Sequence, residues 1–139
     1  MINYFSKSIK RKIARRITKK YPTRIDNFII DGYSVVRFVN WENPLVESKK
    51  ITLNNINFFK KFINDGDLVV DIGSNIGHMT TAMSLAAGKD GITLAFDPNP
   101  FVYEILLQNS KLNPDLTNIH PFNYAISEQE DEFYYNSSE

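Results

Sequence analysis

The stretch Leu68-Val69-Val70-Asp71-Ile72-Gly73-Ser74-Asn75-Ile76-Gly77 carries the strongest indication of the fold. Its first five residues form a short apolar run, which is typical of a parallel strand covered on both faces. The glycines that follow predict a tight turn at Gly73 and a close approach of helix to strand at Gly77. A helix should then continue to about Ala87, with Ile76, Met79, Met83 and Ala86 on one side. The stretch therefore predicts a strand, a loop whose backbone a ligand can touch, and a helix.

The same alternation continues downstream. Residues 92–96 and 119–126 read as two further strands. The helix between them is expected to begin at Asn99-Pro100, to carry Val102, Ile105, Leu106 and Asn109 on one face, and to stop at Asn113-Pro114. Residues 132–135 are a candidate for a fourth strand. This order predicts an α/β fold with a parallel sheet and right-handed crossovers.

Upstream of the alternation, residues 25–64 are expected to lead into the domain. Residues 28–30 and 33–39 read as two strands joined by Asp31-Gly32, a pair suited to a two-residue type I′ turn. Apolar residues at helical spacing predict a helix over residues 53–63, capped by Thr52 or Asn54.

The first 24 residues hold nine of the sixteen Lys and Arg and no acid. Ile2, Phe5, Ile9, Ile13 and Ile17 recur at helical spacing, so residues 1–24 predict a basic amphipathic helix that ends before Pro22. Two uses remain open: packing on the body of the protein, or contact with an anionic membrane surface or partner. The remainder of the chain is acidic, which excludes a uniformly basic nucleic-acid-binding body, and no nucleic-acid partner is expected.

The composition narrows the possible sites further. The 139 residues include no cysteine and two histidines, which excludes disulfides, thiolate metal sites and a cysteine nucleophile. No metal ligands are predicted. Because no run is long and apolar enough for a membrane span or a signal peptide, a cytoplasmic location is expected.

Two carboxylates lie at the ends of the first two predicted strands: Asp71 at the end of the first, and Asp97, 26 residues later, at the end of the second. Asp97 ends the second strand, where a carboxylate can accept hydrogen bonds from both ribose hydroxyls. Asp71 occupies the place of the first glycine of a nicotinamide-binding loop, which disfavours a pyrophosphate and suits a positively charged group. Two alternatives stay open. The protein could be an NAD-dependent oxidoreductase, or Asp71 could only cap the loop that follows it. His78 is explained as well by a structural hydrogen bond as by a ligand contact.

Three segments within residues 66–128 resemble the FkbM-type S-adenosylmethionine-dependent methyltransferases. They are LVVDIGSNIGHMTTAMSLA, GITLAFDPNPFVYEILLQNSKLN and NYAISE. The resemblance implies a Rossmann-like class I methyltransferase sheet and S-adenosyl-L-methionine as cofactor. It also implies that the methionyl part of the cofactor would meet Asp71, Gly73, Ser74, Asn75 and Gly77, that the ribose would meet Asp97, and that the adenine would lie beside Asn123-Tyr124-Ala125. The family usually has alanine where this chain has Ser74, and often glutamate where it has Asp97.

The family's sheet has seven strands and a later acidic motif that has no counterpart here. Residues 65–139 are therefore expected to form the N-terminal part of such a domain, as a fragment, a truncated product or one half of a split enzyme completed by a C-terminal half. The resemblance implies methylation of a hydroxyl on a small molecule or glycan, with catalytic residues unknown. A non-catalytic nucleotide-binding remnant is the other alternative.

Overall fold

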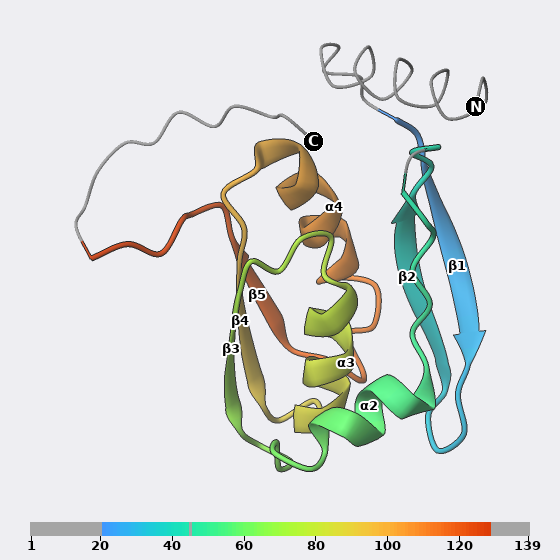
Figure 1. The fold of residues 1–139 in the computed structure, drawn as a ribbon. Coiled ribbons are helices and arrows are strands. Elements are labelled where there is room, and N and C mark those ends of the chain that lie inside the picture. Colours follow the sequence, from blue (N-terminus) through green and yellow to red (C-terminus); the bar gives the residue numbers. More distant parts are fainter. Residues whose placement is uncertain (1–20, 45, 129–139) are drawn as a thin grey trace, which may run out of the picture.

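The computed structural model describes residues 21–44 and 46–128 (Figure 1). An antiparallel hairpin of β1 (Thr23–Ile29) and β2 (Val35–Trp41) comes first, followed by α2 (Leu53–Phe59). Strands and helices then alternate as β3 (Leu68–Ile72), α3 (His78–Ala87), β4 (Ile92–Phe96), α4 (Pro100–Asn109) and β5 (Ile119–Phe122). Within these residues no helix is both long and apolar enough to cross a membrane.

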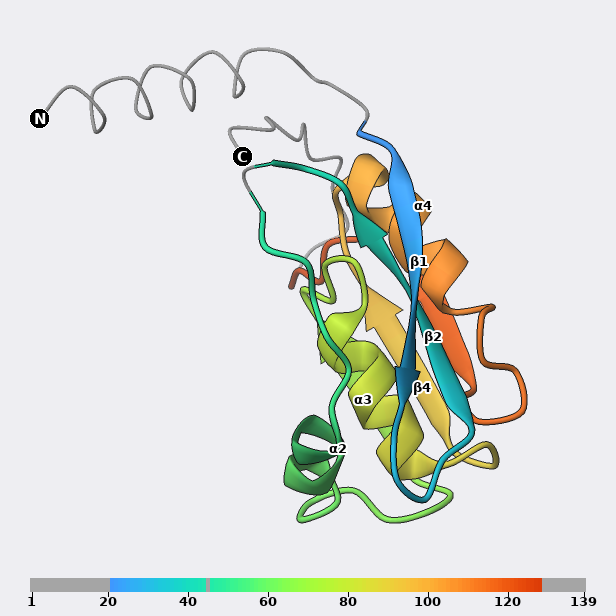
Figure 2. The ribbon, with the colours of Figure 1, turned by 90° about the vertical axis from the view of Figure 1, so that its right-hand side faces the viewer.

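The second half forms the predicted parallel sheet, in the order β3-β4-β5. Helices α3 and α4 lie on one face of this sheet, and the hairpin lies on the far side of the helices, so the fold has three layers (Figures 1 and 2). The buried apolar cluster includes Val36 and Phe38 of the hairpin, Ile56 of α2, Leu85 of α3 and Ile105 of α4. The hairpin is thus part of the core and not an appendage.

Helix α4 forms as the sequence predicts at its start and on its buried face. The Asn99 side chain caps it by accepting from the Phe101 amide, and Pro100 occupies the first turn. The four residues expected on one face are the four that are buried: Val102, Ile105, Leu106 and Asn109. The helix ends at Asn109, before the expected Asn113-Pro114 stop.

Helix α2 begins at the predicted Thr52 cap and not at Asn54. Thr52 and Asn55 form a capping box in which each side chain bonds to the backbone of the other residue. The expected end near residue 63 is wrong, because the helix stops at Phe59 and the chain tightens into a turn in which the Phe62 amide bonds the Phe59 carbonyl.

The hairpin is confirmed, but its turn is not. β1 begins at Thr23, earlier than expected, and the five residues 30–34 connect the strands. A type I′ turn needs positive φ at both central residues. Gly32 has φ 81°, whereas Asp31 is not among the described non-glycine residues with positive φ. The Tyr33 amide closes the turn on the Ile30 carbonyl.

Of the residues expected on one side of helix α3, Ile76 and Ala86 are buried as predicted, but the two methionines are not. Met79 is exposed and Met83 half-buried, while the buried positions hold small residues such as Thr80, Ala82 and Ser84. Small side chains let the helix lie close to the sheet, so the larger methionines are left at its margin.

The prediction that β3 is covered on both faces is also wrong for the described residues. β3 is an edge strand, and Leu68, Val70 and Ile72 are 64, 52 and 64% exposed. Alternate strand residues point to opposite faces, so these three lie on the face opposite the helices. β5 ends at Phe122, before the expected residue 126. The predicted helix in residues 1–20 and the fourth strand at 132–135 fall outside the described residues.

Candidate functional site

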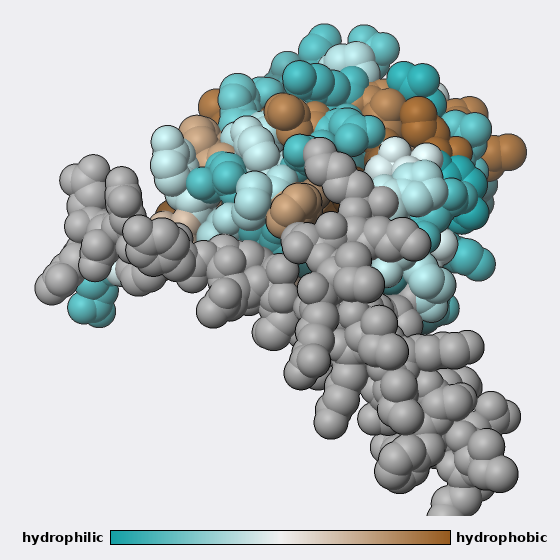
Figure 3. Space-filling model, turned by 90° about the horizontal axis from the view of Figure 1, so that it is seen from above, coloured by the Kyte–Doolittle hydropathy of each residue, from teal (hydrophilic) through white to brown (hydrophobic). Residues whose placement is uncertain are grey.

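The carboxyl ends of β3, β4 and β5 meet at one edge of the sheet, because the three strands are parallel. Ile72 lies opposite Phe96, and Phe96 lies opposite Phe122 with the two rings stacked at 4.9 Å. Seen from this end, hydrophobic residues lie among hydrophilic ones on the described surface (Figure 3). Ligands of open α/β sheets bind at such an edge.

The loop from Gly73 to Gly77 connects β3 to α3 and turns sharply. The amides of Gly73 and Ser74 both donate to the Phe96 carbonyl, which ties the loop to the end of β4. Gly73 has φ 82°, and a Cβ built on it would meet no atom of the described residues within 4 Å. The predicted tight turn is therefore confirmed, and space lies open beside the backbone at Gly73.

Gly77 leaves room for helix α4, and not for the strand that was expected to lie beside it. A Cβ on Gly77, whose φ is 88°, would lie 2.8 Å from Leu106 Cδ1 in α4. The prediction of a helix-to-strand approach is thus wrong at this residue, because the neighbour that needs the space is another helix. The N-terminus of α3 follows directly, and its first amides have no acceptor within the helix.

Asp97 directly follows β4 and is 8% exposed. Its Oδ2 accepts from the Asn75 amide and its Oδ1 from the Asn99 amide, both at 2.9 Å. The Asn123 side-chain amide donates to the Asp97 carbonyl at 2.8 Å. A carboxylate offers about four acceptor positions, so about two remain beyond these backbone bonds.

Asp71 lies near the end of β3, beside the start of α3. Its Oδ2 accepts from the Thr80 hydroxyl at 2.6 Å, and its carbonyl accepts from the Ser74 hydroxyl at 2.9 Å. No described residue donates to the other carboxylate oxygen. Thr80 is a contact that sequence reasoning missed, since a buried threonine in a helix carries no local sign of its partner.

The structure brings some of the predicted residues together and leaves others apart. Asn75 and Asn123 both contact Asp97, whereas Tyr124 and Ala125 are exposed and belong to no strand. Ser74 is buried, with its hydroxyl turned to the backbone of Asp71. The role of residues 123–125 beside an adenine stays a prediction.

His78 makes the contacts of a structural histidine. Its Nε2 lies 2.9 Å from the Lys50 carbonyl, and its ring meets Phe38 edge to face with centroids 6.2 Å apart. No group of three or more histidines or acids within the described residues could hold a metal ion.

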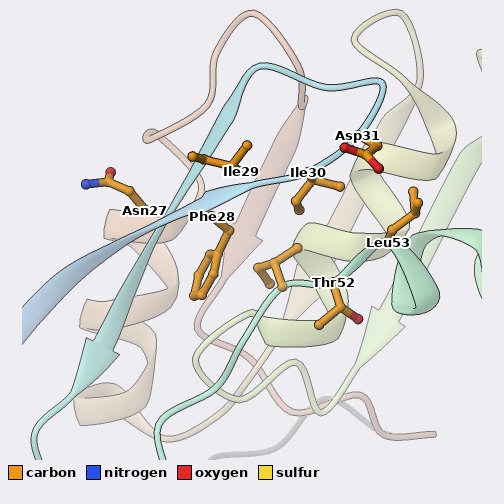
Figure 4. Close-up of a pocket in the computed structure, with 8 residues that line it drawn as sticks. Asn27, Phe28, Ile29, Ile30, Asp31, Thr52 and Leu53 are labelled. Carbon is orange, nitrogen blue, oxygen red and sulfur yellow. The ribbon is translucent and has the colours of Figure 1, made fainter.

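A separate cavity of about 500 Å³ lies at the far end of the hairpin (Figure 4). Phe28, Ile30 and Leu53 line it, together with Asp31 in the turn of the hairpin and Thr52 at the start of α2. None of the residues predicted to bind a cofactor lines this cavity.

No protein-family model matches the chain, and no curated protein matches it. The chain is similar to several solved structures, including the following two. A "putative transferase" from Pyrococcus horikoshii aligns with a TM-score of 0.52 and 17% identity, over 73% of this chain and 36% of that one. A "putative rRNA-methylase" from Clostridium thermocellum aligns with a TM-score of 0.44 and 19% identity, over 52% of this chain and 40% of that one.

The likeness to the Pyrococcus structure bears on the fold. At 17% identity, the Pyrococcus structure supports the α/β arrangement and no more than that. The chain spans less than half of the length of either structure. The FkbM resemblance finds no matching family model and stays a prediction.

Proposed function

We propose that this chain binds S-adenosylmethionine as the N-terminal part of a methyltransferase domain, and that the complete domain methylates a hydroxyl group. The observation that carries the proposal is the bond between the Asp97 carboxylate and the Asn75 amide. This bond connects a carboxylate that suits the ribose of the cofactor with a glycine loop that suits its methionyl part. Both features lie at the sheet edge where α/β proteins bind ligands.

The residues fit such a cofactor in three respects. Open space beside Gly73 leaves room for a ligand against the backbone. The Asp71 carboxylate oxygen that accepts from no described residue suits the ammonium group of the methionyl part. Asp97, held by two backbone amides, keeps acceptor positions for the ribose hydroxyls. Asp71 also argues against a pyrophosphate, because two negative groups would lie close together.

When bound, the cofactor supplies a methyl group on a positively charged sulfur. Transfer to an oxygen needs an aligned nucleophile, so the task of the residues described here is to hold and orient. The hydroxyl acceptor, and the group that takes its proton, belong in this proposal to the remaining part of the domain. A small molecule or glycan fits that role.

Calorimetric titration with S-adenosylhomocysteine and with NAD tests the proposal. S-adenosylhomocysteine should bind more tightly than NAD, and Asp97→Ala should weaken its binding by about 1 to 3 kcal/mol, which is the usual range for hydrogen bonds to a charged group. Asp90→Ala is the matched control, because Asp90 is an exposed acid in the turn before β4, at the opposite edge of the sheet.

Equal affinity of wild type and Asp97→Ala would contradict the site assignment. Tighter binding of NAD would favour the oxidoreductase, and binding of neither ligand would contradict both nucleotide functions. Because Asp97→Ala also removes two backbone contacts, the melting curve of each variant is recorded first.

A further inference from the structure

Asn109 is the polar residue on the buried face of α4, and it is 1% exposed. Its Oδ1 accepts from the Val39 amide at 2.6 Å, and its Nδ2 donates to the Val39 carbonyl at 3.1 Å. The same Nδ2 also donates to the Ile76 carbonyl at 2.7 Å. One side chain therefore joins the hairpin, α4 and the glycine loop.

Asn113, four residues later, repeats two of these three bonds. Its Oδ1 accepts from the Arg37 amide and its Nδ2 donates to the Arg37 carbonyl, both at 2.8 Å. Arg37 and Val39 are alternate residues of β2, so both asparagines bond to the strand edge that faces away from β1. Only Asn109 reaches the glycine loop as well.

The loop contains a left-handed backbone conformation that hydrogen bonds hold in place. Asn75 has φ 50° and is the one described non-glycine residue with positive φ. Asparagine adopts this conformation more readily than other non-glycine residues, because its short side chain can hydrogen-bond to the nearby backbone. Here the Asn75 amide bonds Asp97, the Ile76 amide bonds the Asn75 side chain, and Asn109 holds the carbonyl of Ile76.

We infer that Asn109 is a positioning residue for the ligand-binding loop, and that through it the β1–β2 hairpin is part of the scaffold of the cofactor site. The inference rests on the proposed function for the identity of the ligand. It concerns the shape of the loop before any ligand binds, so it can be tested without one.

The experiment compares Asn109→Ala with Asn113→Ala in the full chain. Each variant loses two hydrogen bonds to β2, and only Asn109→Ala loses the bond to the loop. Amide hydrogen exchange in the ligand-free protein should be at least tenfold faster at Asn75 and Ile76 in Asn109→Ala, measured relative to the amides of α3. In Asn113→Ala the same ratio should change less than twofold.

Binding of S-adenosylhomocysteine supplies the second measurement. It should weaken at least tenfold in Asn109→Ala and less than twofold in Asn113→Ala. If Asn109→Ala does not fold, Asn109→Ser replaces it, because a hydroxyl has one donor and can serve only one of the two carbonyls.

Equal changes in the two variants, or loop amides that exchange at the wild-type rate in the Asn109 variant, would overturn the inference. If wild type binds no S-adenosylhomocysteine while the exchange results follow expectation, the proposed function fails and the role of Asn109 in shaping the loop stands.

Discussion

At the scale of single residues, Asp26 ties the start of the hairpin to the chain beyond it. Its carboxylate accepts from the Arg24 guanidinium at 2.8 Å and from the Asn40 side chain at 2.8 Å. The Asn40 amide also donates to the Lys49 carbonyl, so the contacts continue into the segment before α2. The hydrogen bond from Arg24 is the largest influence that lowers the pKa of Asp26 below its ordinary value.

A pKa that is lower in the folded than in the unfolded chain stabilises the fold above the unfolded value, about 3.9. That contribution is lost as the pH falls through the lower, folded pKa. The free energy of unfolding of Asp26→Asn at pH 7 should therefore be lower than that of wild type. The difference should be less than about 1 kcal/mol, as expected for an ion pair near the surface. Thermal melts of wild type and Asp26→Asn at a series of pH values measure this difference, which should disappear at acidic pH. Asp31→Asn, in the exposed turn, is the control. A gap that persists at low pH would assign the effect to packing.

At the scale of elements, the approach of α3 to α4 depends on the missing side chain of Gly77. Gly77→Ala combines a left-handed backbone with a Cβ 2.8 Å from Leu106 Cδ1. Gly32→Ala has a similar φ of 81°, but in the described part of the chain no atom lies within 4 Å of the added carbon. We expect Gly32→Ala to cost about 1 to 2 kcal/mol and Gly77→Ala about 1 to 3 kcal/mol more. Urea unfolding measures both, and equal losses would show that Leu106 moves aside freely.

The elements also differ in how far their sequence could predict them. β3, β4 and the start of α4 follow from local signals, namely short apolar runs and the Asn99-Pro100 cap. The same local signals placed Asp71 and Asp97 at strand ends. The contacts of Asn109 with Val39 lie 70 residues apart in sequence, and no local pattern encodes such a pairing. The available signal was an asparagine at a position of α4 otherwise occupied by apolar residues.

At the scale of the whole molecule, one face of the parallel sheet carries apolar residues that no described element covers. The exposed members are Leu68, Val70, Ile72 and Ile92. Parallel sheets are nearly always covered on both faces, and an apolar edge strand offers its backbone to other chains. The four residues form a surface prone to association.

We therefore expect the chain to associate as its concentration rises, with the larger species reduced in Val70→Lys. Ile29→Lys is the matched control, because Ile29 is 91% exposed at the end of β1, on the other side of the helices. Sedimentation velocity over a range of concentrations measures the effect. A monomeric wild type, or an equal effect of the two lysines, would contradict the role of this face.

The asparagine contacts between β2 and the end of α4 also affect how the chain folds as it is made. The hairpin leaves the ribosome before its partners: Asn109 follows Val39 by 70 residues, and Asn113 follows Arg37 by 76. At about 5 to 20 residues per second, this interval lasts roughly 4 to 15 seconds. An isolated two-stranded hairpin is marginally stable in water. The early part of the nascent chain must therefore wait for its docking site, and slower translation would lengthen that exposure.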